Sequence, residues 1–167
     1  VINNREMTIN ASIGVTAAHC LYDNQYWYTK MFFCAGFNDG NCVKNVAILK
    51  AAVVMRDDKY YYDYGLIKFD NSSNLQNKIG YLDWDNNPGN NVEVTIFGYS
   101  MNSELQCAKN GNVLCMWHGI STQIGSFRHV PVDTGSGSSG GPWIKLFDSK
   151  KKQGWLVGSV SSSGPGS

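Results

Sequence analysis

Short apolar runs, separated by polar and turn-forming residues, recur along the whole chain. They are rich in Val, Ile, Phe and Tyr, which favour strands, and several alternate with polar positions as half-buried strands do. No segment shows a sustained helical period with caps at both ends. The pattern therefore predicts an all-β protein, either a sandwich or barrels. The runs lie at residues 31–37, 45–55, 64–69, 91–99, 122–130, 142–147 and 154–162.

The strongest polar interruption of this pattern is the segment DWDNNPGNN, residues 83–91. Pro, Gly and clustered Asn favour turns and connections. A length of 167 residues suits one domain or two closely joined halves. We interpret the segment as the joint between an N-terminal half, residues 1–85, and a C-terminal half, residues 86–167.

Composition narrows the classes of function. A hydrophobic content of 43% excludes general disorder, and a net charge of +1 gives no electrostatic reason to expect a nucleic acid partner. No apolar run reaches the length of about 18 residues that a membrane-spanning helix needs. We therefore expect neither nucleic acid nor membrane among the partners.

Five cysteines add information about the compartment. Cys34 lies close to Cys42 and Cys107 close to Cys115, and no Cys or His grouping has the spacing of a zinc site. Proximity favours two local disulfides and predicts no metal, which points to an oxidising, secreted setting. Cys20 is left without a partner in this scheme. The sequons at Asn10 and Asn71 agree with secretion but are short enough to occur by chance.

Three motifs carry candidate chemistry. VTAAHC, residues 15–20, places His19 after a predicted strand. YDYGLIKF, residues 62–69, places Asp63 before an apolar run, and GSGSSGGP, residues 135–142, contains Ser139. A Gly/Ser-rich run alone is more often a linker. Glycines, however, also permit the turn that aims backbone N–H groups at a developing oxyanion.

The competing residues have weaker contexts. Ser136 and Ser138 lie in the same run, but only Ser139 is followed directly by Gly-Gly-Pro. His118 and His129 have no motif around them, so we interpret them as packed or surface residues.

Together the three motifs, in the order His, Asp, Ser, resemble the trypsin/chymotrypsin-like serine proteases, whereas α/β-hydrolases run Ser, acid, His. The short interval between Asp63 and Ser139 is similar to that of compact secreted microbial enzymes, including glutamyl endopeptidases. The resemblance implies two antiparallel Greek-key barrels of about six strands each. It implies a secreted, monomeric serine endopeptidase that acts on peptides or proteins without a cofactor.

The resemblance also implies roles for individual residues. Ser139 would be the nucleophile, His19 the base and Asp63 the acid that orients it. The N–H groups of Gly137 and Ser139 would hold the oxyanion. The strand SVSSSG, residues 159–164, would pair with the substrate backbone, with Ser161, Ser162 and Ser163 beside the specificity pocket.

The preferred residue before the cleaved bond stays open at this point. Asp133 lies where a trypsin carries its selector for basic residues, which favours cleavage after Arg or Lys. Thr134 is compatible with the carboxylate-binding pocket of glutamyl endopeptidases, but the histidine those enzymes use is replaced by Val160. We favour basic residues, with Glu or a broad preference as alternatives.

The sequence departs from the family pattern at two places, and each departure leads to a prediction. Ser138 replaces the aspartate that pairs with the new N-terminus in vertebrate-type enzymes, so that activation switch is not expected. Few residues precede His19, and Cys20 has no cysteine upstream. The resemblance therefore predicts that N- and C-terminal elements of the family fold are missing from this chain. The alternative function is a protease-fold binding protein without catalysis.

Overall fold

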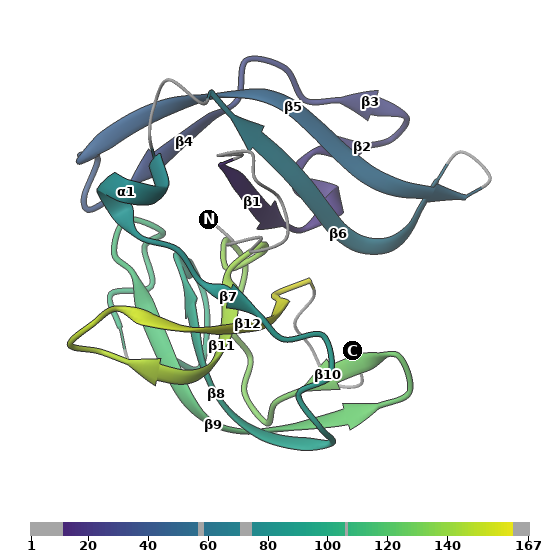
Figure 1. The fold of residues 1–167 in the computed structure, drawn as a ribbon, viewed down its shortest axis with the longest axis vertical. Helices are drawn as coiled ribbons and strands as arrows, with labels where there is room; N and C mark the ends of the chain where they lie inside the picture. Colours follow the sequence, from purple (N-terminus) through teal and green to yellow (C-terminus); the bar gives the residue numbers. More distant parts are fainter. Residues whose placement is uncertain (1–11, 57–58, 71–74, 106, 162–167) are drawn as a thin grey trace.

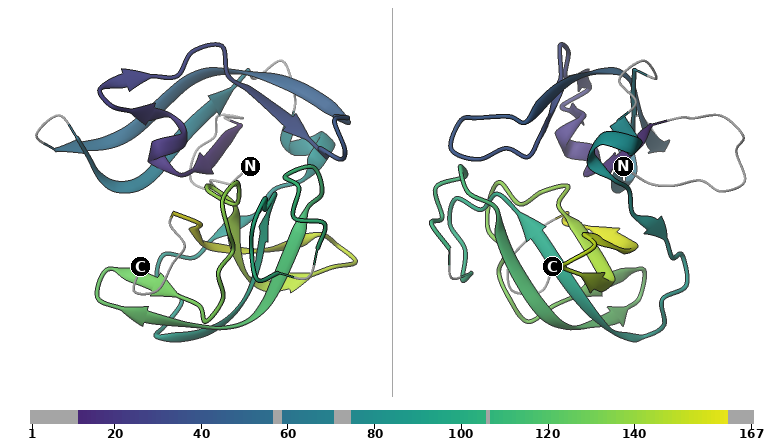
Figure 2. Two further views of the ribbon diagram at one scale, coloured as in Figure 1. Left: turned by 180° about the vertical axis from the view of Figure 1, so that it is seen from behind. Right: turned by 60° about the vertical axis from the view of Figure 1, so that its left-hand side comes forward.

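The computed structural model describes residues 12–56, 59–70, 75–105 and 107–161. The chain forms two curled, strand-rich halves that lie one above the other (Figure 1), as the views from behind and from the side also show (Figure 2). The predicted apolar runs coincide with the main strands, so the all-β prediction is confirmed. The chain passes from one half to the other through a short helix, α1 (Leu75–Ile79), and strand β7 (Asp83–Trp84).

The N-terminal half contains a four-stranded antiparallel sheet in the order β1-β6-β5-β4. A separate hairpin, β2 with β3, follows the turn that contains His19. The bounds of these strands are β1 (Ile13–Thr16), β2 (Tyr22–Asp23), β3 (Tyr26–Trp27), β4 (Phe32–Ala35), β5 (Lys44–Arg56) and β6 (Lys59–Phe69).

Strand β6 has one buried face, and Asp63 belongs to it. Side chains along a strand alternate between faces, and Gly65, Ile67 and Phe69 are buried while the residues between them are exposed. Asp63 has the same parity, so it points to the inner side of the sheet. The adjoining core cluster consists of Leu21, Val46, Ile67, Phe69 and Leu75.

The C-terminal half contains a six-stranded sheet in the order β10-β9-β8-β11-β12-β7. All neighbouring pairs are antiparallel except β12 with β7. Its further strands are β8 (Asn91–Gly98), β9 (Cys115–Ile124), β10 (Phe127–His129), β11 (Pro142–Asp148) and β12 (Gln153–Ser159). Its core cluster consists of Val92, Val94, Ile96, Trp143 and Val160.

The start of the polar segment 83–91 forms strand β7 of the C-terminal sheet. Trp84 of β7 pairs with Leu156 of β12, so this part of the chain already belongs to the C-terminal sheet. The boundary at residue 85 stays a prediction.

Two disulfides, Cys34–Cys42 and Cys107–Cys115, join the pairs that proximity predicted. Cys20 is in the thiol form, and burial raises its pKa. Each disulfide closes a loop, and the two loops meet, because the N–H of Asp39 donates to the carbonyl of Asn112 at 2.9 Å. In the described part of the chain, no helix is long and apolar enough to cross a membrane.

Candidate active site

His19 lies in a single 3₁₀ turn, Ala18–Cys20, that directly follows strand β1. Ala17 and Ala18 are fully buried and hold the turn against the protein, whereas the side chain of His19 is 34% exposed. Small apolar residues before the histidine thus allow a tight turn that leaves the imidazole accessible.

Asp63 holds this histidine at two points. Its Oδ1 accepts the backbone N–H of His19 at 2.9 Å, and its Oδ2 lies 2.8 Å from Nδ1 of the ring. An ionised carboxylate only accepts hydrogen bonds, so the neutral imidazole carries its proton on Nδ1. The other ring nitrogen, Nε2, is then an acceptor, which is the form a general base requires.

Ser161 completes the surroundings of the carboxylate. Its hydroxyl donates to Oδ2 of Asp63 at 2.5 Å, from a position 98 residues further along the chain. Burial raises the pKa of Asp63, but hydrogen bonds from Ser161 and from the backbone and ring of His19 outweigh burial. The pKa of Asp63 therefore lies below its usual value, and the carboxylate is ionised at neutral pH.

The loop that carries Ser139 packs against the segment before His19. The N–H of Gly140 donates to the carbonyl of Val160 at 2.7 Å, and the N–H of Val160 donates to the carbonyl of Gly141 at 2.8 Å. Gly140 has φ of +77° and approaches Thr16 and Ala17 so closely that a Cβ would collide with them. Only glycine fits this turn, and its close approach brings Ser139 to the segment that holds His19.

The three serines of the loop differ in their surroundings. Ser138 is 1% exposed, and its hydroxyl donates to the carbonyl of Thr134 at 2.6 Å. Ser136 is exposed and lies in the turn that the N–H of Ser138 closes on the carbonyl of Gly135. Ser139 is partly buried, and within the described residues no group engages its hydroxyl. Of the three, Ser139 is best placed to react.

Two backbone N–H groups of this loop are available for a ligand. Those of Gly137 and Ser139 donate to no acceptor among the residues that the structure describes, although the neighbouring N–H groups of Ser138, Gly140 and Gly141 all do. Gly137 has φ of +87°, a conformation that side chains disfavour. Two free donors beside a hydroxyl can stabilise a negative oxygen.

The remaining predicted site residues lie around the same loop. One oxygen of Asp133 accepts the N–H of Gly135 at 2.7 Å, and Thr134 is buried. The hydroxyl of Ser161 donates to Asp63, a contact that the motifs did not indicate. Its place beside a specificity pocket stays a prediction. Ser162 and Ser163 lie outside the described residues, as do the sequons at Asn10 and Asn71.

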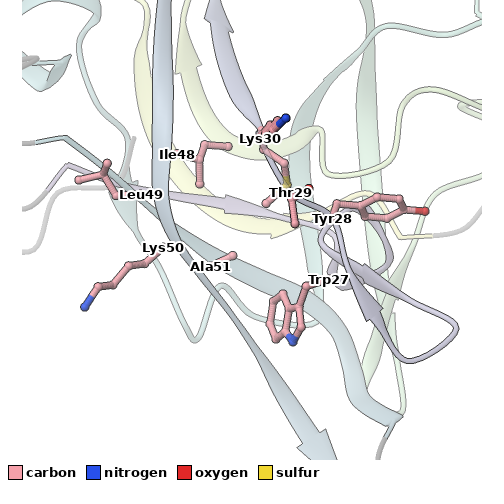
Figure 3. Close-up of a pocket in the computed structure, with 9 residues that line it drawn as sticks. Trp27, Tyr28, Thr29, Lys30, Ile48, Leu49, Lys50 and Ala51 are labelled. Atoms are coloured by element: carbon pink, nitrogen blue, oxygen red, sulfur yellow. The ribbon is translucent and has the colours of Figure 1, made fainter.

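A surface histidine and a surface hollow lie outside the candidate site. His118 bonds Thr95 and Glu93 on the surface of the second sheet. Among the described residues, no three His, Cys, Asp or Glu side chains are grouped to hold a metal ion. A shallow hollow of about 350 Å³ on the first half contains none of the predicted site residues (Figure 3). It is lined by residues 27–31 and 48–51.

Comparison with known sequences shows the family of this chain. The family model of the trypsin-like peptidase domain matches residues 7–151. No curated protein matches the sequence significantly.

Three solved structures have the same fold. The chain is similar to the protease Anisep from Arthrobacter nicotinovorans, with 22% identity and a TM-score of 0.70 over 90% of this chain and 74% of that one. A thermostable serine protease, AL20, from an extremophilic microorganism has 21% identity and a TM-score of 0.73, over 90% of this chain and 72% of that one. A Glu endopeptidase in complex with MPD has 23% identity and a TM-score of 0.67, over 89% of this chain and 68% of that one. These similarities confirm the predicted chymotrypsin-like fold of two antiparallel barrels.

Proposed function

The chain belongs to the family of trypsin-like peptidase domains, and on that premise we propose that it is a secreted serine endopeptidase with the triad Ser139, His19 and Asp63. The observation that carries the proposal is the double hold of Asp63 on His19, at the backbone N–H and at Nδ1. That hold leaves Nε2 of His19 as the acceptor that a general base needs.

The proposed reaction proceeds through an acyl-enzyme. Oγ of Ser139 attacks the carbonyl carbon of the scissile peptide while Nε2 of His19 takes the hydroxyl proton. The carbonyl oxygen becomes negative and receives the N–H groups of Gly137 and Ser139. His19 then gives the proton to the leaving amine, and Asp63, which stays ionised, stabilises the imidazolium. A water molecule then attacks the acyl-enzyme carbonyl while His19 takes its proton. The bond to Ser139 breaks, and the new carboxylic acid is released.

We propose a preference for Arg or Lys before the cleaved bond. Asp133 supports this preference, because one of its oxygens is held by Gly135 and a fixed carboxylate is suited to a cationic side chain. The Glu preference named for one structural neighbour is the main alternative. Against it, Val160 is buried in the core at the position where the resemblance expects a histidine.

The two disulfides support secretion, since such bonds persist in oxidising compartments. Peptides or proteins are the proposed substrates, and we propose a monomer.

Labelling with a fluorophosphonate probe, followed by peptide mapping, tests the proposed nucleophile. We expect the label on Ser139, its loss in Ser139→Ala and in His19→Ala, and its retention in Ser136→Ala, a matched change of an exposed serine in the same loop. An unlabelled wild type that is correctly folded would reject the enzyme and favour the binding-protein alternative. Chromogenic peptides ending in Arg, Lys, Glu or Leu test the preference, and equal rates on all four would refute it.

A further inference from the structure

We propose that Asn102 is a positioning residue that orients the N–H of Gly137 toward the reacting carbonyl. This inference rests on the proposed function, in which Gly137 is one of the two oxyanion donors. Asn102 lies in the segment Tyr99–Asn102 that follows strand β8, and none of the sequence motifs includes it.

Asn102 and its neighbour hold Ser136 on both sides. Oδ1 of Asn102 accepts the N–H of Ser136 at 3.0 Å, and the N–H of Met101 donates to the carbonyl of Ser136 at 2.8 Å. Asn102 and Ser136 also form an isolated antiparallel bridge. Ser136 is therefore fixed through its backbone, although its side chain is exposed.

The carbonyl of Ser136 and the N–H of Gly137 belong to one planar peptide unit. In a trans peptide these two groups point in opposite directions. Because the carbonyl is directed at Met101, the N–H of Gly137 is directed away from segment 99–102, and it has no acceptor among the described residues. The contacts of Ser136 thus determine where the proposed oxyanion donor points.

The same segment also limits movement of Gly137. A Cβ at this position would lie 2.5 Å from the carbonyl oxygen of Tyr99, so the glycine backbone already contacts that carbonyl closely. A rotation of the 136–137 peptide would need the bond from the N–H of Met101 to the carbonyl of Ser136 to break or Tyr99 to move. Asn102 holds the preceding 135–136 peptide through the N–H of Ser136, and so fixes the residue about which the 136–137 peptide would turn.

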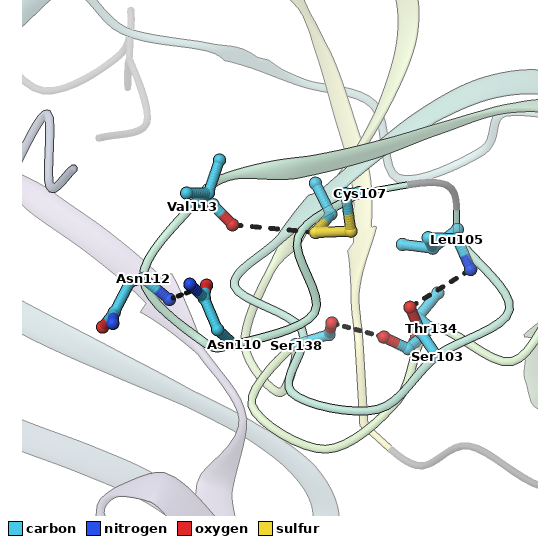
Figure 4. The surroundings of a disulfide bond; sticks show 9 residues. Ser103, Leu105, Cys107, Asn110, Asn112, Val113, Thr134 and Ser138 are labelled. Carbon is cyan, nitrogen blue, oxygen red and sulfur yellow. Dashed lines mark hydrogen bonds between the residues drawn. A yellow bond between two sulfur atoms is a disulfide. The ribbon is translucent and has the colours of Figure 1, made fainter. Parts of the chain in front are cut away.

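Segment 99–102 is itself well anchored. The hydroxyl of Tyr99 donates to the carbonyl of Phe37 in the other half at 2.7 Å, and the N–H of Gly111 donates to the carbonyl of Ser100 at 3.0 Å. The loop continues into the Cys107–Cys115 disulfide, and Figure 4 shows Ser138 and Thr134 of the neighbouring loop beside it. An anchored support can hold the 136–137 peptide in one orientation.

Three variants test the inference. Asn102→Ala removes the acceptor, Asn102→Asp keeps a side-chain oxygen at the same place, and Asn110→Ala is the control. Asn110 lies in the same loop, is exposed, and likewise accepts a backbone N–H, that of Asn112 at 2.9 Å.

Loss of a whole oxyanion donor costs on the order of 10²–10³ in kcat, so a misaligned donor should cost less. We expect Asn102→Ala to lower kcat about 10-fold with KM changed less than about 2-fold, because the donor acts in the transition state. Asn102→Asp should recover kcat to within about 3-fold of wild type, and Asn110→Ala should match wild type. Affinity for a peptide boronic acid, which forms a tetrahedral adduct, should fall in Asn102→Ala by the same factor as kcat/KM.

An unchanged kcat in Asn102→Ala, or an Asn102→Asp variant no better than the alanine, would overturn the inference. A wild type that takes no fluorophosphonate label would instead reject the proposed function. Amide hydrogen exchange then tests the positioning alone. Faster exchange of residues 135–139 in Asn102→Ala than in Asn110→Ala would support it, and equal exchange would overturn it.

Discussion

Replacement of Ser161 by alanine tests how the buried end of the site is held together. The change removes one of three hydrogen bonds that the carboxylate of Asp63 accepts and leaves the two bonds from His19. Hydrogen bonds to charged groups contribute about 1.5–3 kcal/mol. The side chain of Asp63 is 16% exposed, so water replaces part of the lost bond and we expect the lower end, about 1.5 kcal/mol. For a chain of this size that is about 3–6 °C in Tm.

The dependence on pH separates this bond from a general packing effect. The pKa of Asp63 is lowered in the folded protein, so its contribution is fully present above the unfolded value of about 3.9. The contribution is lost as the pH falls through the folded pKa. The difference in stability between wild type and Ser161→Ala should therefore be largest near pH 7 and shrink at about pH 3.

Urea unfolding at the two pH values measures this difference. Ser159→Ala is the matched control, because Ser159 ends strand β12 two residues before Ser161, is partly buried, and its hydroxyl makes no hydrogen bond to any described residue. A loss that is the same at both pH values, or the same loss in Ser159→Ala, would refute the assigned role of the bond between hydroxyl and carboxylate.

Three further predictions concern the triad, the loop and a disulfide. Asp63→Asn should lower kcat/KM about 10⁴-fold, because an amide favours the wrong tautomer of the histidine, while circular dichroism shows that the fold is retained. A small loss would contradict the role of Asp63 in the triad. Gly137→Ala should destabilise the protein by about 1–3 kcal/mol, since its φ of +87° and the carbonyl of Tyr99 both oppose a side chain; an unchanged urea midpoint contradicts this. The double change of Cys107 and Cys115 to serine should lower the free energy of unfolding by about 2–3 kcal/mol, because the unfolded chain regains the entropy of a loop with a sequence separation of 8. Unchanged thermal unfolding would show that the disulfide is not formed in solution.

Local pattern alone predicted most of the fold and the candidate site residues. Alternating or continuous apolar runs are a property of each strand's own residues, so β5, β8, β11 and β12 could be placed from them. The disulfides join cysteines of close sequence position, which proximity could indicate. His19 and Ser139 stood out because the neighbouring residues that shape their turns are part of each motif. Asp63 lies within strand β6, and the resemblance of the three motifs in order to a known family indicated it.

Other elements depend on partners far away in the sequence. Strands β2, β3 and β7 have two residues each, too few for any period to show. The first half of β9 lay outside the predicted runs, and its pairing with β8 defines it as a strand. In each case a hydrogen-bonded neighbour, not the segment's own composition, determines the conformation.

The sequence by itself determined the class of fold, the order of the candidate triad and the local disulfides, because these are encoded in short stretches of chain. Only the tertiary structure decided that Ser161 donates to Asp63 across 98 residues, and that Asn102 holds Ser136 from 34 residues away. Serine and asparagine occur throughout polar loops, and nothing local distinguishes one that bonds a distant backbone from one that faces water. Such a bond exists only after folding has brought the two distant segments together.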